Sequence, residues 1–338
     1  MKATSTFVSL LIIQIGLFAQ NITPQLLGFD EYQIDSKKYG EINYYISSDT
    51  TSHLKPLLVY LDGSGADPLF QKMESGIAST VVIDFQRLQT EYRILFISKP
   101  GIPFYGERAS SPNPGSSIPH EPLDYTERLS RDWRVGSANL IIDRLVKEKS
   151  IDTSRIVVLG FSEGAQVAPK LACENEHVTH LMMFGGNGLN QLFDPIITTR
   201  MKASKGTLSE IEAQHQIDSL LLIYKDIYAN PTSTSDRWWG HTYKRWASFS
   251  TTDPYQELLT LDIPIYIAIG SLDENSILSA DYIQLEFIKN GKTNLTYKAY
   301  PNCDHQFNEI ITENGEFTSA TSKINAVMET AFDWLKLN

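Results

Sequence analysis

The sequence has few cysteines and a deficit of basic residues, which disulfide-rich and nucleic-acid-binding proteins, respectively, need. It holds two cysteines among 338 residues, and its 40 acidic residues outnumber its 29 lysines and arginines, which form no clusters. This charge balance gives no support for nucleic-acid binding and mainly favours solubility. The sequence also lacks internal repeats and low-complexity linkers. These absences leave a folded, globular chain as the expectation.

An apolar run at the N-terminus is too short to span a membrane. Lys2 precedes the apolar stretch Phe7 to Phe18, and the small residue Ala19 follows it, whereas a spanning helix needs about 20 apolar residues. The pattern predicts a signal peptide over residues 1–19, with an uncleaved anchor as the alternative. No cysteine follows the run directly, which argues against a lipoprotein. We therefore expect a secreted or periplasmic protein without a stable membrane anchor.

One five-residue motif, Gly160-Phe161-Ser162-Glu163-Gly164, says most about function. It follows the apolar run Ile156 to Leu159 and precedes a segment that can be helical, Ala165 to Cys173. A strand, a tight turn with a serine at its apex and a helix together form a nucleophile elbow. The glycines permit the sharp turn and the close approach of neighbouring chain. The helix N-terminus offers N–H groups to a developing oxyanion.

Two candidate partners follow the serine in the order that a Ser–Asp–His triad requires. Asp273 comes just after the apolar run Pro264 to Gly270, and His305 comes just after the last predicted strand. Glu274 and Asp304 compete with Asp273 for the role of the acid, and His305 has the capping of a loop as its alternative role. These residue types suit acyl transfer, because a histidine takes the serine proton and a buried carboxylate orients the imidazole.

From Glu41 to the C-terminus the chain resembles the α/β-hydrolase family. Its elbow is similar to that of bacterial serine hydrolases that read G-x-S-E-G-A/G with Ala-Pro a few residues on, as Gly160 to Pro169 does here. The resemblance implies a mostly parallel central sheet flanked by helices. It also implies Ser162 as nucleophile, His305 as base and Asp273 as orienting acid, with no cofactor and no metal.

The oxyanion hole of this family takes one N–H group from the residue after the nucleophile, here Glu163, and one from the loop after an earlier strand. That strand is predicted over Leu57 to Leu61, and the loop is Asp62 to Gly65. Many relatives carry His-Gly where this chain has Asp-Gly. Ser64 is our choice of donor, and Gly65 is the alternative. The loop could also be a plain glycine turn with no role in an oxyanion hole. The acidic side chain of Glu163 also suits the positive end of a helix dipole.

Short continuous apolar runs alternate with amphipathic segments along the chain. This pattern predicts an α/β domain whose parallel sheet is covered on both faces. The predicted strands are 41–47, 57–61, 93–97, 156–161, 179–184, 265–269 and 293–300. Helices are predicted over 129–149 and 322–337, each with an apolar stripe. The hydrolase core is assigned to residues 20–186 and 263–338.

Residues 187–262 interrupt this alternation before the penultimate core strand, and we expect them to form a helical cap over the site. The second half of this segment is rich in aromatic side chains, among them Trp238 and Trp239. These two rings and His241 are predicted to contact substrate. The alternative is that a small cap needs such large residues for its own core.

The two cysteines are expected to remain free thiols, although an exported chain can form disulfides. Cys173 lies eleven residues beyond Ser162, roughly 16 Å along a helix, whereas Cys303 belongs to the active-site end of the sheet. A disulfide needs Cα atoms within about 7 Å of each other. Pro169 is expected to kink this helix or end it early, which shortens the separation too little to change the prediction.

The sequence predicts a secreted serine hydrolase that cleaves a carboxylic ester through an acyl-enzyme on Ser162. The substrate is expected to be a small-molecule ester or a short peptide, with no cofactor and no nucleic-acid partner. Amide hydrolysis by a peptidase or aminopeptidase is the first alternative. The others are acyl transfer to an acceptor other than water and a catalytically silent binding protein on the same fold.

Overall fold

The computed structural model describes residues 22–48, 53–73, 76–107, 121–313 and 316–338. The predicted signal peptide, residues 1–19, lies outside this described part of the chain. Among the helices of the described residues, none has the length and the apolar character needed to cross a bilayer.

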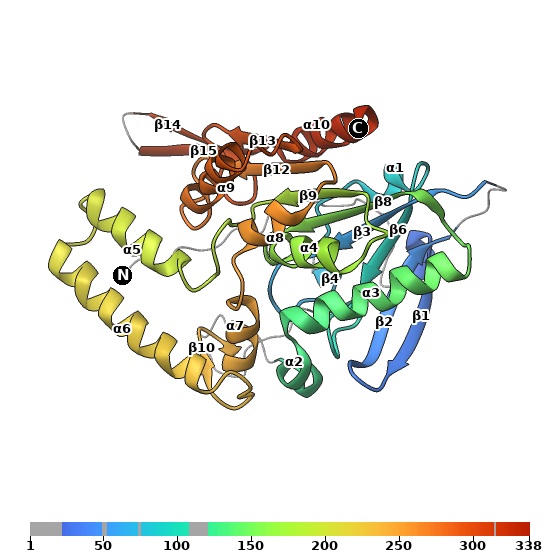
Figure 1. Cartoon of the computed structure of the whole chain (residues 1–338), viewed down its shortest axis with the longest axis horizontal. Helices are drawn as coiled ribbons and strands as arrows, with labels where there is room; N and C mark the ends of the chain where they lie inside the picture. Colours follow the sequence, from blue (N-terminus) through green and yellow to red (C-terminus); the bar gives the residue numbers. More distant parts are fainter. Residues whose placement is uncertain (1–21, 49–52, 74–75, 108–120, 314–315) are drawn as a thin grey trace.

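A central sheet of eight strands organises the molecule (Figure 1). The two pairs that involve β2 are antiparallel, and the remaining pairs are parallel. The mostly parallel sheet predicted from the apolar runs is therefore confirmed. In spatial order the strands are β1 (Phe29–Ser36), β2 (Gly40–Ser47), β6 (Arg93–Ile97), β3 (Pro56–Leu61), β8 (Asp152–Phe161), β9 (His180–Phe184), β12 (Ile265–Gly270) and β13 (Leu295–Tyr300).

Helices cover both faces of the sheet, because alternate side chains of a strand point to opposite faces. In β3, Leu57 and Val59 pack into one layer, and Leu58 and Tyr60 pack into the other. The first layer contains α3 (Arg131–Lys147), α4 (Glu163–Glu174), α8 (Pro254–Thr260) and α9 (Ile277–Lys289). The second contains α1 (Phe85–Leu88) and α10 (Ile324–Leu337). The two predicted helices correspond to α3 and α10.

Helix α4 continues to Glu174 with Pro169 inside it, so the expected early end of this helix is wrong. A proline removes one N–H group from a helix, and the burial of α4 in the core offsets that loss. Cys173 and Cys303 are both free thiols, as predicted.

Residues 187–262, called the insertion below, connect β9 to β12. The segment contains α5 (Asp194–Ser204), α6 (Glu210–Ala229), the short strands β10 (Arg237–Trp238) and β11 (His241–Thr242), and α7 (Tyr243–Phe249), and it ends with α8. Helices α5 and α6 pack against each other and extend away from the sheet, on the left of Figure 1. A hydrophobic cluster that includes Tyr224, Ile227 and Trp246 stabilises this part.

Several elements outside the main sheet were not predicted. A small sheet combines β4 (Phe70–Met73), β5 (Gly76–Ser79) and β7 (Tyr105–Glu107), and a hairpin of β14 (Asn308–Glu313) and β15 (Glu316–Ser322) precedes α10. Short helices η1 (Pro24–Leu27) and α2 (Leu123–Arg128) lie in connecting segments. The hairpin is largely exposed, so its sequence carries no apolar alternation that would mark it as two strands.

Candidate active site

The elbow between β8 and α4 depends on close contacts that a side chain would prevent. A Cβ on Gly160 would lie 2.3 Å from the carbonyl oxygen of Gly164, and one on Gly164 would lie 2.0 Å from the carbonyl oxygen of Leu61. Ser162 has φ of 54° and ψ of −117°, a strained conformation for a residue with a side chain. The glycines therefore let the chain reverse sharply and present Ser162 at the start of α4.

The structure brings Ser162, His305 and Asp273 together. The Nε2 atom of His305 lies 2.9 Å from Ser162 Oγ, and its Nδ1 atom lies 2.6 Å from Asp273 Oδ2. Asp273 and His305 follow β12 and β13, whose carboxyl ends lie at the same edge of the sheet as that of β8. The competing acids are engaged elsewhere, because Glu274 pairs with Lys205 and Asp304 accepts N–H groups of its own loop.

Asp273 controls the protonation of His305. Burial disfavours the imidazolium, but the neighbouring Asp273 carboxylate outweighs this effect and raises the pKa of His305. Asp273 itself is 2% exposed, so water screens this interaction weakly. The imidazole is thereby held in the tautomer that presents Nε2 to the Ser162 hydroxyl.

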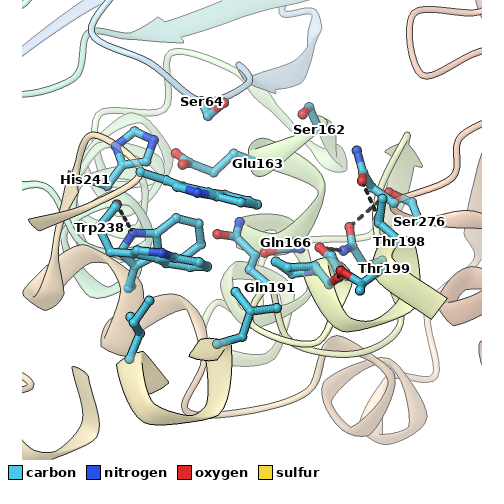
Figure 2. Close-up of a pocket in the computed structure, with 18 of the residues that line it drawn as sticks. Ser64, Ser162, Glu163, Gln166, Gln191, Thr198, Thr199, Trp238, His241 and Ser276 are labelled. Carbon is cyan, nitrogen blue, oxygen red and sulfur yellow. Dashed lines mark hydrogen bonds between the residues drawn. The ribbon is translucent and has the colours of Figure 1, made fainter. Parts of the chain in front are cut away.

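A cavity of about 710 Å³ opens beside Ser162 and His305. The insertion supplies an aromatic wall, where Trp238 and Trp239 stack with ring centres 4.6 Å apart. Neutral polar side chains, those of Thr198, Thr199 and Ser276, lie on the side of the cavity away from this wall (Figure 2). Gln166 and Gln191 lie between the two sides. The cavity therefore offers both an apolar surface and hydrogen-bonding groups within reach of the serine.

All three predicted substrate contacts, Trp238, Trp239 and His241, line this cavity. Trp239 is 65% exposed, whereas Trp246 is buried and donates its ring N–H to the Trp238 carbonyl oxygen at 2.7 Å. The aromatic residues thus include both core members and accessible ones. His241 Nδ1 lies 3.6 Å from Glu121 Oε1, and burial lowers the pKa of this histidine, which favours a neutral ring at the cavity wall.

The fold resembles solved structures of hydrolases. The chain matches an esterase of Pyrococcus furiosus at 12% identity with a TM-score of 0.51, covering 94% of this chain and 91% of the esterase. It matches an acylaminoacyl peptidase of Pyrococcus horikoshii at 11% identity (TM-score 0.51, 82% and 38% covered) and a puromycin-hydrolyzing peptidase of Mycobacterium tuberculosis at 14% (TM-score 0.50, 82% and 36% covered). The chain therefore spans little more than a third of the length of these two peptidases.

No protein-family model and no curated protein matches the sequence. The strand order, the elbow after β8 and the structural matches nevertheless agree. The chain has the α/β-hydrolase fold. This fold is the one that the resemblance in sequence implied, and it places Ser162, Asp273 and His305 at the carboxyl end of the sheet.

Five buried charged side chains form a continuous series in this α/β-hydrolase fold, called the ion chain below. Each member is at most 5% exposed. In order they are Lys99, Asp62, Arg134, Glu163 and Arg245. Successive members pair at 2.7 Å between Lys99 and Asp62, 2.6 Å between Asp62 and Arg134 and 2.8 Å between Arg134 and Glu163, whose other oxygen accepts from Arg245.

The sequence alone indicates a favourable place for Glu163 at a helix N-terminus but does not reveal its partners. Burial would raise the pKa of Glu163, but Arg245 and Arg134 outweigh burial and lower the pKa to about 2. Its contribution to stability is therefore present above its ordinary pKa of 4.5 and is lost as the pH falls towards 2. The one signal in the sequence was Arg134, a charge among the apolar residues of a helix that faces the core.

Glu163→Gln should lower the free energy of unfolding by about 3–5 kcal/mol, because Arg245 is left buried without its carboxylate. Glu148→Gln is the matched control, since it breaks an exposed pair with Arg144 whose side chains are 49% and 43% exposed, and should cost at most about 1 kcal/mol. Urea unfolding at pH 7 measures both. Equal losses in the two variants would show that the ion chain does not stabilise the fold.

Proposed function

We propose that this protein is a serine hydrolase that cleaves a carboxylic ester through an acyl-enzyme on Ser162. The observation that carries the proposal is the pair of contacts that His305 makes, at 2.9 Å to Ser162 Oγ and at 2.6 Å to Asp273 Oδ2. A serine hydroxyl is a weak nucleophile unless a base takes its proton. These contacts supply the base and the carboxylate that orients it.

In the proposed mechanism, Ser162 Oγ forms a bond to the carbonyl carbon of the ester while its proton passes to His305 Nε2. The carbonyl electrons become an oxyanion, which the N–H groups of Glu163 and Ser64 stabilise. His305 then gives the proton to the departing alcohol, which leaves an acyl-enzyme. Water attacks the acyl group in the same way, and His305 again acts first as base and then as acid.

In this proposal the insertion is the cap of the active site and selects the substrate. Trp238, Trp239 and His241 contribute to the cavity wall beside Ser162, and aromatic faces bury large apolar groups well. A small ester with an apolar or aromatic part fits this wall. The chain needs no cofactor for these steps, and the predicted signal peptide favours action outside the cytoplasm.

Hydrolysis of a short peptide is the second candidate, and the match in fold to an acylaminoacyl peptidase supports it. The ratio of kcat/KM values for matched ester and aminoacyl-amide substrates separates the two candidates.

A fluorophosphonate probe should label the wild-type protein once, as measured by intact mass, because an activated serine displaces its fluoride. Ser162→Ala should remain unlabelled. Ser154→Ala, an exposed position in the same strand β8, is the matched control and should be labelled like the wild type. A folded wild type that stays unlabelled would contradict the proposal and favour the binding protein on the same fold.

The rate should rise with pH as His305 loses its proton, because only the neutral imidazole can act as base. Since Asp273 raises the pKa of His305, the midpoint of kcat/KM for p-nitrophenyl acetate should lie above the ordinary histidine value of about 6.5. Asp273→Asn should lower kcat by roughly 10⁴-fold, as in other triads. A midpoint below the ordinary value in the wild type would contradict this assignment of the base.

A further inference from the structure

The ammonium group of Lys99 is fully engaged by the loop that follows β3. Its Nζ atom donates to Asp62 Oδ2 at 2.7 Å, to the Gly63 carbonyl oxygen at 2.6 Å and to the Gly65 carbonyl oxygen at 2.9 Å. An ammonium group has three N–H donors, so these acceptors use all of them. The side chain is 2% exposed, and water therefore competes little for these bonds. Two of the three bonds hold backbone carbonyl groups.

These backbone bonds determine which way the peptide groups of the loop face. In a planar trans peptide, the C=O group of one residue and the N–H group of the next point in opposite directions. Because the Gly63 carbonyl points to Lys99, the Ser64 N–H group points away from Lys99. Ser64 is exposed and lines the cavity that contains Ser162. A Cβ on Gly63 would lie 3.4 Å from Ser162 Cβ, so this peptide passes next to the serine.

We propose that Lys99 is the positioning residue of the oxyanion hole. The inference rests on the proposed serine hydrolase function and deepens it. Lys99 is not among the residues that line the cavity, so it acts through the Gly63–Ser64 peptide, whose N–H group it holds towards the substrate oxygen. Without the ammonium group, Gly63 leaves the peptide free to rotate, and a carbonyl oxygen then faces the developing negative charge in place of a donor.

The ion chain strengthens this role through its net charge. Its three cations and two carboxylates leave one positive charge. The protein interior has a lower dielectric constant than water, so buried charges interact more strongly with other charges than exposed ones do. The residual positive charge lies in the structure that supports the loop and the start of α4. It therefore favours negative charge on a substrate oxygen held between these two segments.

Lys99→Met tests the inference with two ketones of the same shape. With 1,1,1-trifluoro-4-phenylbutan-2-one, Ser162 Oγ bonds to the carbonyl carbon, its proton passes to His305, and the carbonyl electrons form an oxyanion. The parent 4-phenylbutan-2-one occupies the cavity without forming a stable oxyanion. We expect the Ki of the trifluoro ketone to rise about 10²–10³-fold, the effect of losing one oxyanion donor, while the Ki of the parent ketone stays close to that of the wild type.

The kcat for p-nitrophenyl acetate should fall by the same factor in Lys99→Met, with KM nearly unchanged, because the lost interaction acts in the transition state. A merely structural role would not separate the two ketones or kcat from KM. Only folded molecules turn over substrate, so both Ki values are measured on the folded fraction of the sample. Their ratio can therefore be compared with that of the wild type even if a variant is only partly folded. Lys99→Gln, which keeps an amide donor, is the second variant and should give an intermediate ratio.

Arg131→Met is the matched control, because it removes another buried cation that pairs with Glu257 and not with the loop. It should lower stability and keep the wild-type ratio of the two Ki values. A wild-type ratio in folded Lys99→Met or Lys99→Gln would overturn the inference. A wild type that neither prefers the trifluoro ketone nor reacts with a fluorophosphonate would instead overturn the proposed function.

Discussion

Five buried charges must each find a partner, and this requirement ties the parts of the candidate active site together. Asp62 begins the loop after β3, Glu163 begins α4, and Arg245 lies on α7 of the insertion. Arg134 of α3 contacts both carboxylates. A buried charge that loses its partner destabilises a protein by several kcal/mol, so none of these segments can shift alone. The loop, the elbow and the insertion therefore keep one arrangement.

This arrangement explains how one cavity is built from segments that are distant in sequence. The sheet places the serine and its two partners at its carboxyl edge, where loops of parallel strands meet. The insertion adds the aromatic wall, and Arg245 fixes that wall to the start of α4 through Glu163. The residues proposed to select the substrate are thereby held at a set distance from Ser162. The proposed chemistry and the proposed selectivity depend on the same buried contacts.

Much of the fold and of the candidate site could be predicted because both carry local signals. Ser162 stands between an apolar strand and a helix, and Asp273 and His305 each follow a strand, so their chain order was sufficient to predict that the three side chains lie together. Nearly all side chains of strand β1 and of the hairpin β14–β15 are exposed or half-buried, and their sequences lack such a pattern. The ion chain could not be predicted, because its five members come from five distant segments and only folding makes them neighbours.

The most direct measurement is the mass of the protein during its first turnover. Wild-type protein is mixed with p-nitrophenyl acetate, quenched with acid before the steady state, and digested for peptide mapping. We expect an acetyl group on the peptide that contains Ser162, formed together with a burst of p-nitrophenolate equal to the concentration of active sites. Release of p-nitrophenolate with no acetylated protein, or acetylation of a different residue, would contradict this expectation.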